Sequence, residues 1–125
     1  MSSVYSTASV NLPDTLPKPT GYHILVAMPK VEEATKGGVL LPTDLKTRED
    51  IASIVAQVVT IGRDAYPDTD PRFKDGAWCE EGDWVVLSKY TGHRFEYDGC
   101  ELRLINDDSV LAVVEDPTKV SRANA

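Results

Sequence analysis

The sequence has few of the side chains that catalysis and metal binding require. It contains two histidines and two cysteines in 125 residues. They form no Cys-x-x-Cys or His-x-x-x-His pair that could begin a zinc site, and no serine stands in a motif that suggests a Ser-His-Asp triad. A phosphate-binding glycine pattern is also absent. We therefore expect no catalytic residues, no metal site and no enzyme activity.

Positive charge and long apolar runs are scarce as well. Thirteen Lys and Arg residues stand against 20 Asp and Glu residues, for a net charge of −7. Nucleic acids and anionic membranes require a basic face, so we expect neither as a partner. No apolar run approaches the roughly 20 residues of a spanning helix. The Ser/Thr-rich start does not resemble a secretory signal, and two lone cysteines form no disulfide framework, which together predict a cytoplasmic protein.

The few reactive side chains have simpler structural interpretations. His23 lies in an apolar stretch, where a hydrogen-bonded structural histidine is expected, and His93 follows a turn glycine and should be exposed. Cys79 and Cys100 are expected to be small core residues. The aspartates within residues 63–76 lack the spacing of a calcium-binding loop and predict a solvated loop instead.

Short apolar stretches separated by turn signals are what the sequence does contain. Asp98-Gly99 is a strong β-hairpin signal between two alternating stretches. No long helical pattern is present, and a weak one predicts at most a short helix at residues 44–52. The pattern predicts an all-β barrel or sandwich, with strands at residues 22–28, 54–61, 84–88, 94–97, 101–105 and 110–114.

The most informative segment is residues 32–42, Glu-Glu-Ala-Thr-Lys-Gly-Gly-Val-Leu-Leu-Pro. One interpretation is a short buried strand. The other is an exposed loop, in which the glycines allow many backbone conformations. A partner that buried its aliphatic tip would gain about 1.5–3 kcal/mol per residue before ordering costs. The residues alone leave both interpretations open.

Taken in order along the chain, the motifs resemble those of the GroES-like co-chaperonin family. The resemblance runs from about Pro19 to Glu115. Residues 33–42 resemble the mobile loop of the family, and Val39-Leu40-Leu41 stands in the place of its chaperonin-binding aliphatic tripeptide. Each motif is weak alone, but the series is specific; the others are Ile24-Leu25-Val26, Gln57 to Gly62, Gly82 to Leu87, Lys89 to Gly92, Tyr97-Asp98-Gly99 and Val110 to Glu115.

The resemblance implies a small irregular GroES-like β-barrel with a long mobile loop, assembled into a ring that is usually a heptamer. The expected organisation is a flexible arm at 1–18, a barrel at 19–116 with a mobile loop at 30–50 and a roof loop at 63–81, and a polar tail at 117–125. The chaperonin-binding residues would be Gly37, Gly38, Val39, Leu40, Leu41 and Pro42. The first and last strands would pair between neighbouring subunits, through Ile24, Leu25, Val26, Val110, Leu111, Ala112, Val113 and Val114.

The function implied by this resemblance is that of a co-chaperonin. Such a protein caps a GroEL-type chaperonin ring in an ATP-dependent cycle and assists the folding of an unfolded client protein in the chamber. ATP is bound and hydrolysed by the partner chaperonin, so no cofactor is expected on this chain.

Some parts of the chain depart from the common bacterial pattern. Tyr22-His23 replaces the usual acidic-basic pair, and residues 63–81 lack the usual roof sequence. Together with Gly82-Asp83-Trp84, this stretch resembles versions carried by bacteriophages, for which the location would be the host cytoplasm. One alternative function is a phage structural or adaptor protein that uses the barrel for assembly only. A barrel derived from an alcohol dehydrogenase would need a nucleotide-binding domain, and the chain has no fingerprint for one.

Overall fold

The computed structural model of the chain describes residues 8–9, 12–31 and 53–120. Within these ranges all regular structure is strand or short 3-10 helix, which confirms the predicted all-β class. No helix in them is long and apolar enough to cross a membrane. The strands are β1 (Ala8–Ser9), β2 (His23–Ala27), β3 (Lys30–Val31), β4 (Val55–Ile61), β5 (Trp84–Val86), β6 (His93–Tyr97), β7 (Cys100–Asn106) and β8 (Ala112–Val114), and the 3-10 helices are η1 (Pro71–Phe73), η2 (Asp107–Ser109) and η3 (Pro117–Lys119).

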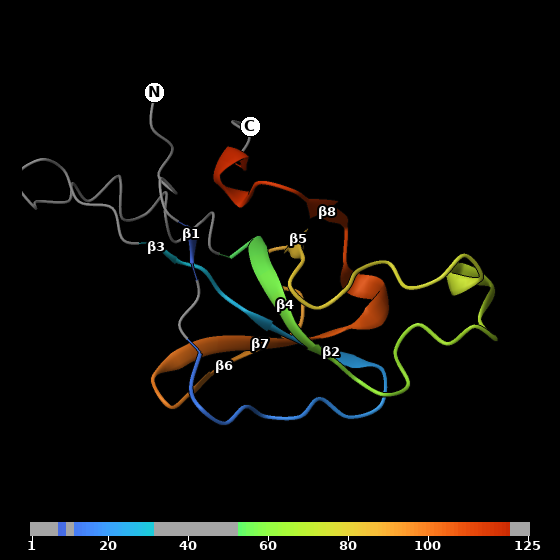
Figure 1. The fold of residues 1–125 in the computed structure, drawn as a ribbon, viewed down its shortest axis with the longest axis horizontal. Coiled ribbons are helices and arrows are strands. Elements are labelled where there is room, and N and C mark those ends of the chain that lie inside the picture. The colour runs from blue at the N-terminus through green and yellow to red at the C-terminus, as the bar shows by residue number, and fades with distance from the viewer. Residues whose placement is uncertain (1–7, 10–11, 32–52, 121–125) are drawn as a thin grey trace, which may run out of the picture.

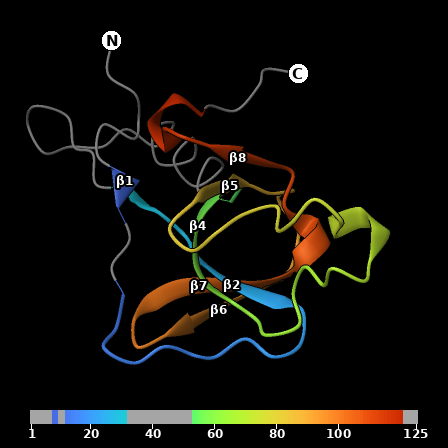
Figure 2. The same cartoon turned by 45° about the vertical axis from the view of Figure 1, so that its right-hand side comes forward.

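Six of the strands form one antiparallel sheet in the order β6-β7-β2-β4-β5-β8, while β1 pairs with β3 in a separate two-stranded ladder. The sheet is strongly bent. β6, β7 and β2 lie in one layer, β5 and β8 lie in another, and β4 crosses between them (Figures 1 and 2). The bent sheet wraps around a hydrophobic cluster, which is consistent with the predicted GroES-like barrel.

The central strand β2 is buried on both faces. Ile24 and Val26 belong to the main hydrophobic cluster, whereas Leu25 and Ala27 belong to a second cluster on the opposite face. Because successive side chains of a strand point to opposite faces, a strand between two clusters must be apolar at every position. This requirement explains the uninterrupted Ile-Leu-Val-Ala run.

The main cluster joins the sheet to the loop between β4 and β5. Val58 of β4, Val85 of β5 and Ile105 of β7 share this cluster with Tyr66 and Phe73 of the loop. Each fully buried aliphatic side chain contributes about 1.5–3 kcal/mol to stability. The loop is therefore part of the core and holds the two layers of the sheet together.

The predicted hairpin at Asp98-Gly99 is confirmed. Asp98 and Gly99 have φ angles of 51° and 78°, and the flanking residues Tyr97 and Cys100 are paired across β6 and β7. Positive φ at both central positions is the property of a type I′ turn, whose twist matches that of two antiparallel strands.

The six predicted strands are all present, as β2 and β4 to β8. The last strand begins at Ala112 instead of Val110. Val110 directly follows η2 and is buried in the main cluster, and Leu111 N donates to Val86 O at 2.9 Å before the ladder with β5 begins. The predicted helix at 44–52 lies outside the described residues.

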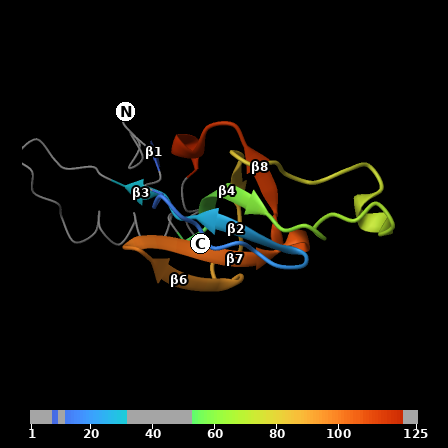
Figure 3. The ribbon, with the colours of Figure 1, turned by 60° about the horizontal axis from the view of Figure 1, so that its bottom comes forward.

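Part of the predicted N-terminal arm packs against the second hydrophobic cluster. Leu16 packs against the cluster formed by Leu25, Ala27 and Leu102, and the Thr15 hydroxyl lies 3.2 Å from the Tyr97 hydroxyl. The described part of the arm that begins at residue 12 runs past β6 and β7 to the start of β2 (Figure 1). Further toward the N-terminus, β1 lies beside β3 (Figure 3).

Candidate functional site

The predicted chaperonin-binding residues, Gly37 to Pro42, lie outside the described residues, but both ends of their segment are described. At the entry, Met28 N donates to Glu101 O at 3.2 Å, and β3 follows. At the return, Leu87 N donates to Ile54 O at 2.8 Å, and β4 follows. β3 lies at the opposite end of the molecule from the loop of residues 63–81 (Figures 1 and 3).

Arg103 of β7 holds the returning end in place. Its side chain is fully buried. Arg103 Nη2 donates to Ser53 O at 2.7 Å and Nη1 donates to Ser88 O at 3.5 Å, while Nε has no partner among the described residues. Burial lowers the pKa of this guanidinium. A buried charge whose hydrogen bonds go to carbonyls therefore joins three separate segments of the chain.

Alternation along a strand puts Arg103 on the face opposite to Leu102 and Leu104. The structure agrees, because both leucines pack with the second cluster. Sequence reasoning missed that the face of Arg103 is also covered. An alternating strand with polar residues on one face normally indicates a solvated face. One local signal did indicate a covered face: the apolar Ile105 lies on the same face of β7 as Arg103.

The prediction that β2 pairs between subunits is wrong. β2 is hydrogen bonded to β4 on one side and to β7 on the other. A strand whose two edges are occupied cannot add a third neighbour. Ile24, Leu25 and Val26 are therefore core residues. The prediction failed because the apolar run of a central strand cannot be distinguished from that of an interface strand.

β8, in contrast, is an edge strand. Among the described residues its only partner strand is β5. A groove of about 490 Å³ lies beside this edge, lined by Trp78, Asp108 and residues 110–113. The predicted interface residues differ in exposure: Val110 is buried, Val114 is half-buried, Ala112 is exposed, and Leu111 and Val113 have exposed fractions of 63% and 47%. We call residues 111–113 the β8 edge.

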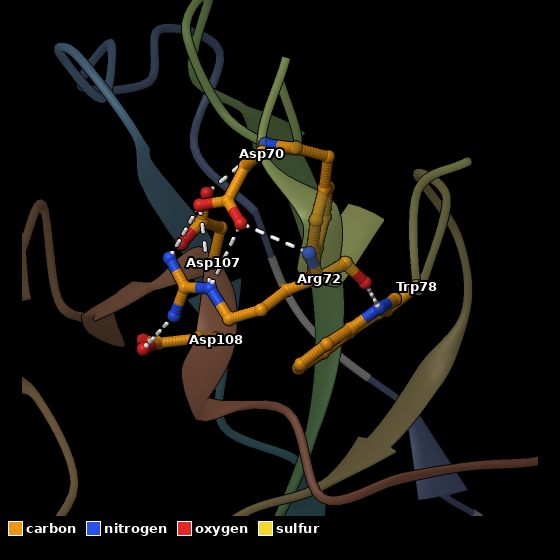
Figure 4. A network of polar contacts seen from close by, with 6 residues as sticks. Asp70, Arg72, Trp78, Asp107 and Asp108 are labelled. Atoms are coloured by element: carbon orange, nitrogen blue, oxygen red, sulfur yellow. Dashed lines mark hydrogen bonds and ion pairs between the residues drawn. The ribbon is translucent and has the colours of Figure 1, made fainter. Parts of the chain in front are cut away.

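One ion pair attaches the loop of residues 63–81 to η2, and a second lies within the loop. The Arg72 guanidinium lies between two carboxylates, with Nη2 at 2.8 Å from Asp70 Oδ2 and Nη1 at 2.7 Å from Asp108 Oδ2 (Figure 4). The hydrogen bond from Arg72 lowers the pKa of Asp70. Next to this pair, the buried Asp107 carboxylate accepts a hydrogen bond from Tyr66 N at 3.0 Å.

Three aromatic rings pack together in the same loop, two of them buried and the third, Trp78, exposed. Phe73 lies edge-on to both Tyr66 and Trp78, with centroid distances of 4.9 Å, and Trp78 Nε1 donates to Arg72 O at 3.3 Å. The Tyr66 hydroxyl is 3.4 Å from Cys79 Sγ, and burial raises the pKa of both groups. The prediction of a solvated loop is thus wrong for Tyr66 and Phe73, which are buried.

His23, His93 and Cys79 are placed as the sequence predicted, whereas Cys100 was predicted in the core and is only half-buried. His23 Nδ1 lies 2.9 Å from Thr20 O, and His93 is exposed on β6. Cys79 is buried and Cys100 is half-buried, both as free thiols. Within the part of the chain that the structure describes, no three His, Cys, Asp or Glu side chains come together as metal ligands.

The bent sheet, the anchored loop and the open β8 edge define a small all-β protein with an edge suited to assembly. The family model described as Chaperonin 10 Kd subunit matches residues 17–114. The chain belongs to this family.

The chain is also similar to curated proteins named Co-chaperonin GroES. It is 35% identical over 99 residues to the protein of Caldicellulosiruptor saccharolyticus, and the match covers 79% of this chain and 97% of the relative. It is 32% identical over 101 residues to that of Acetivibrio thermocellus, with 78% and 97% covered. The protein of Corynebacterium jeikeium is 32% identical over 108 residues, with 86% and 98% covered. These likenesses support a co-chaperonin role, with a GroEL-type partner and oligomerisation.

Proposed function

We propose that this chain caps a GroEL-type chaperonin ring in an ATP-dependent cycle and assists the folding of an unfolded client. The observation that carries this proposal is the family match over residues 17–114, together with a bent all-β sheet of the expected strand composition. The chain acts as a cap and not as an enzyme. The partner binds and hydrolyses ATP, and no cofactor is held by the chain itself. The site of action is the cytoplasm, or the host cytoplasm if a phage carries the chain.

The docking element is the segment containing Gly37, Gly38, Val39, Leu40, Leu41 and Pro42. A groove on the chaperonin buries its three aliphatic side chains, each worth about 1.5–3 kcal/mol before the cost of ordering the segment. That cost keeps a single contact weak. Several copies on one ring, seven in the usual arrangement, make docking firm through avidity and still reversible.

The ring is built through the β8 edge. β8 ends the sheet, and its exposed Leu111 and Val113 lie next to the groove lined by Trp78. An edge strand of this kind is an aggregation hazard unless another chain covers it. A neighbouring copy in the ring would remove the hazard and bury the apolar surface.

The first experiment is size-exclusion chromatography with light scattering, with and without a purified GroEL-type chaperonin and ATP. We expect a ring that co-elutes with the chaperonin only when nucleotide is present. The double variant Leu40→Asp/Leu41→Asp should keep the mass of the ring and lose co-elution. The matched control, Thr35→Asp/Thr47→Asp, adds the same charge outside the docking residues and should still co-elute.

A ring that assembles normally but never co-elutes would overturn the capping function. It would favour the alternative, a phage structural or adaptor protein that uses the barrel for assembly only. Full docking of the Leu40→Asp/Leu41→Asp variant would instead overturn the assignment of the docking residues and leave the capping function in place.

A further inference from the structure

The N-terminal arm reaches the entry of the docking segment. β1 pairs antiparallel with β3, with Ala8 opposite Val31 and Ser9 opposite Lys30. Val31 directly precedes the segment that contains the Gly-Gly-Val-Leu-Leu-Pro motif. Figures 1 and 3 show this short ladder at the end of the molecule where the chain continues from β2 into β3. The backbone at the root of the docking segment is therefore held by a strand from the arm.

The arm is also attached to the sheet between β1 and β2. Leu16 packs against Leu25, Ala27 and Leu102 of the second cluster, and the Thr15 and Tyr97 hydroxyls are 3.2 Å apart. Because these contacts fix the middle of the arm, they raise the effective concentration of β1 beside β3. A two-residue ladder, which would be too weak alone, gains stability from this tether.

This part of the chain lies outside the region shared with the family. The family match begins at residue 17. The relative from C. saccharolyticus matches over 97% of its own length but covers 79% of this chain. β1 and β3 are also outside the six-stranded sheet. β1 is thus an addition to the shared fold, whereas its partner β3 lies within the matched residues.

We propose that the arm positions the docking segment, by holding Lys30 and Val31 extended through the ladder with β1. The held residues do not have to be ordered when the segment docks, which lowers the entropic cost of binding. The same saving occurs in every subunit of a ring, so a small effect per copy becomes large for the assembly. This inference rests on the proposed docking function.

The test removes the ladder and leaves the rest of the chain unchanged. The variant Ala8→Pro/Ser9→Pro removes the amide donors of β1, and proline is incompatible with a paired strand. The matched control Ser2→Pro/Ser3→Pro places two prolines elsewhere in the arm. A third variant lacks residues 1–9. For each ring we would measure the mass, the dissociation rate from a purified GroEL-type chaperonin with ATP, and hydrogen exchange at the amides of Lys30 and Val31.

We expect unchanged ring mass in all variants. In Ala8→Pro/Ser9→Pro and in the deletion, exchange at Lys30 and Val31 should become faster and dissociation should accelerate by about tenfold or more, while the control behaves like the wild type. Equal or slower dissociation of rings that have lost the ladder would overturn the inference alone. A wild-type ring that never docks would overturn the proposed function, and the inference with it.

Discussion

At the scale of single residues, two glycines with the same backbone angle show how much the surroundings decide. Gly92 and Gly99 both have φ of 78°. A Cβ on Gly99 would meet nothing within 4 Å, whereas a Cβ on Gly92 would overlap Leu104 O and lie 2.8 Å from Ile105 Cγ2. Glycine is therefore required at position 92 by the close approach of the turn to β7, in addition to the angle.

We expect Gly92→Ala to destabilise the protein more than Gly99→Ala. Both substitutions place a side chain in the left-handed region, at a cost of about 1–2 kcal/mol. Gly92→Ala should cost a further 1–3 kcal/mol or so, because the β7 backbone must move. Urea unfolding followed by circular dichroism, at one fixed protomer concentration, measures both changes. If both variants lost the same free energy of unfolding, the turn at Gly92 would be free to move away from β7.

The residues that could not be predicted are those whose burial depends on distant parts of the chain. Arg103 is buried beneath the returning end at Ser53, 50 residues away in sequence. Asp107 is buried because it accepts a hydrogen bond from Tyr66 N, 41 residues away. Both look like ordinary surface positions in a local pattern, since arginine and aspartate are rarely buried without such partners.

At the scale of elements, strand positions could be predicted because their signals are local. Alternation identified β6 and β7, and the Asp98-Gly99 pair identified the turn between them. The order of the strands in the sheet, in contrast, depends on residues far apart in the sequence. Whether β2 has a free edge depends on its pairing with β4 and β7, which no pattern within residues 23–27 can show. The docking residues lie outside the described residues, so their assignment stays a prediction.

The ion pair between Asp70 and Arg72 should be lost only in strong acid. The pKa of Asp70 lies below its ordinary value of 3.8, mainly because the Arg72 side chain donates to its carboxylate. A carboxylate with a depressed folded-state pKa stabilises the fold fully above the unfolded pKa, and this contribution is lost as the pH falls through the folded pKa. The ion pair with Arg72 should therefore persist down to pH values below 3.8.

This expectation can be checked by following the Asp70 carboxyl carbon by NMR together with Trp78 fluorescence in a Trp84→Phe background. Both signals should change with one midpoint below pH 3.8. In Arg72→Gln the Asp70 midpoint should rise toward the ordinary value, because the charged donor is gone. The same Asp70 midpoint with and without Arg72 would show that the Asp70–Arg72 pair is not formed in solution.

At the scale of the whole molecule, the two edge strands of the sheet differ in the side chains that they expose. The edge strand β6 presents charged side chains, including Arg94, which is paired with Glu101 of β7. Charged edges discourage pairing with another chain. The β8 edge instead presents Leu111 and Val113, and neither is covered within the described part of the chain. One end of the sheet therefore resists association and the other favours it. In a ring each interface would join two different patches of neighbouring subunits, and the β8 edge would supply one of them.

If assembly depends on this asymmetry, negative charges added at the β8 edge should make the ring dissociate without unfolding the subunit. Leu111→Asp/Val113→Asp removes two exposed apolar side chains and adds to a chain that already carries a net charge of −7, so neighbouring copies should repel each other. Light scattering should then give the mass of a single chain, with a β-sheet circular dichroism spectrum like that of the wild type. The control Tyr90→Asp changes an aromatic side chain that is 87% exposed and does not line the groove beside the β8 edge, and it should leave the ring intact. A full-size ring in the double variant would place the subunit interface elsewhere, and loss of the ring in both variants would point to a general effect of charge and not to a specific contact.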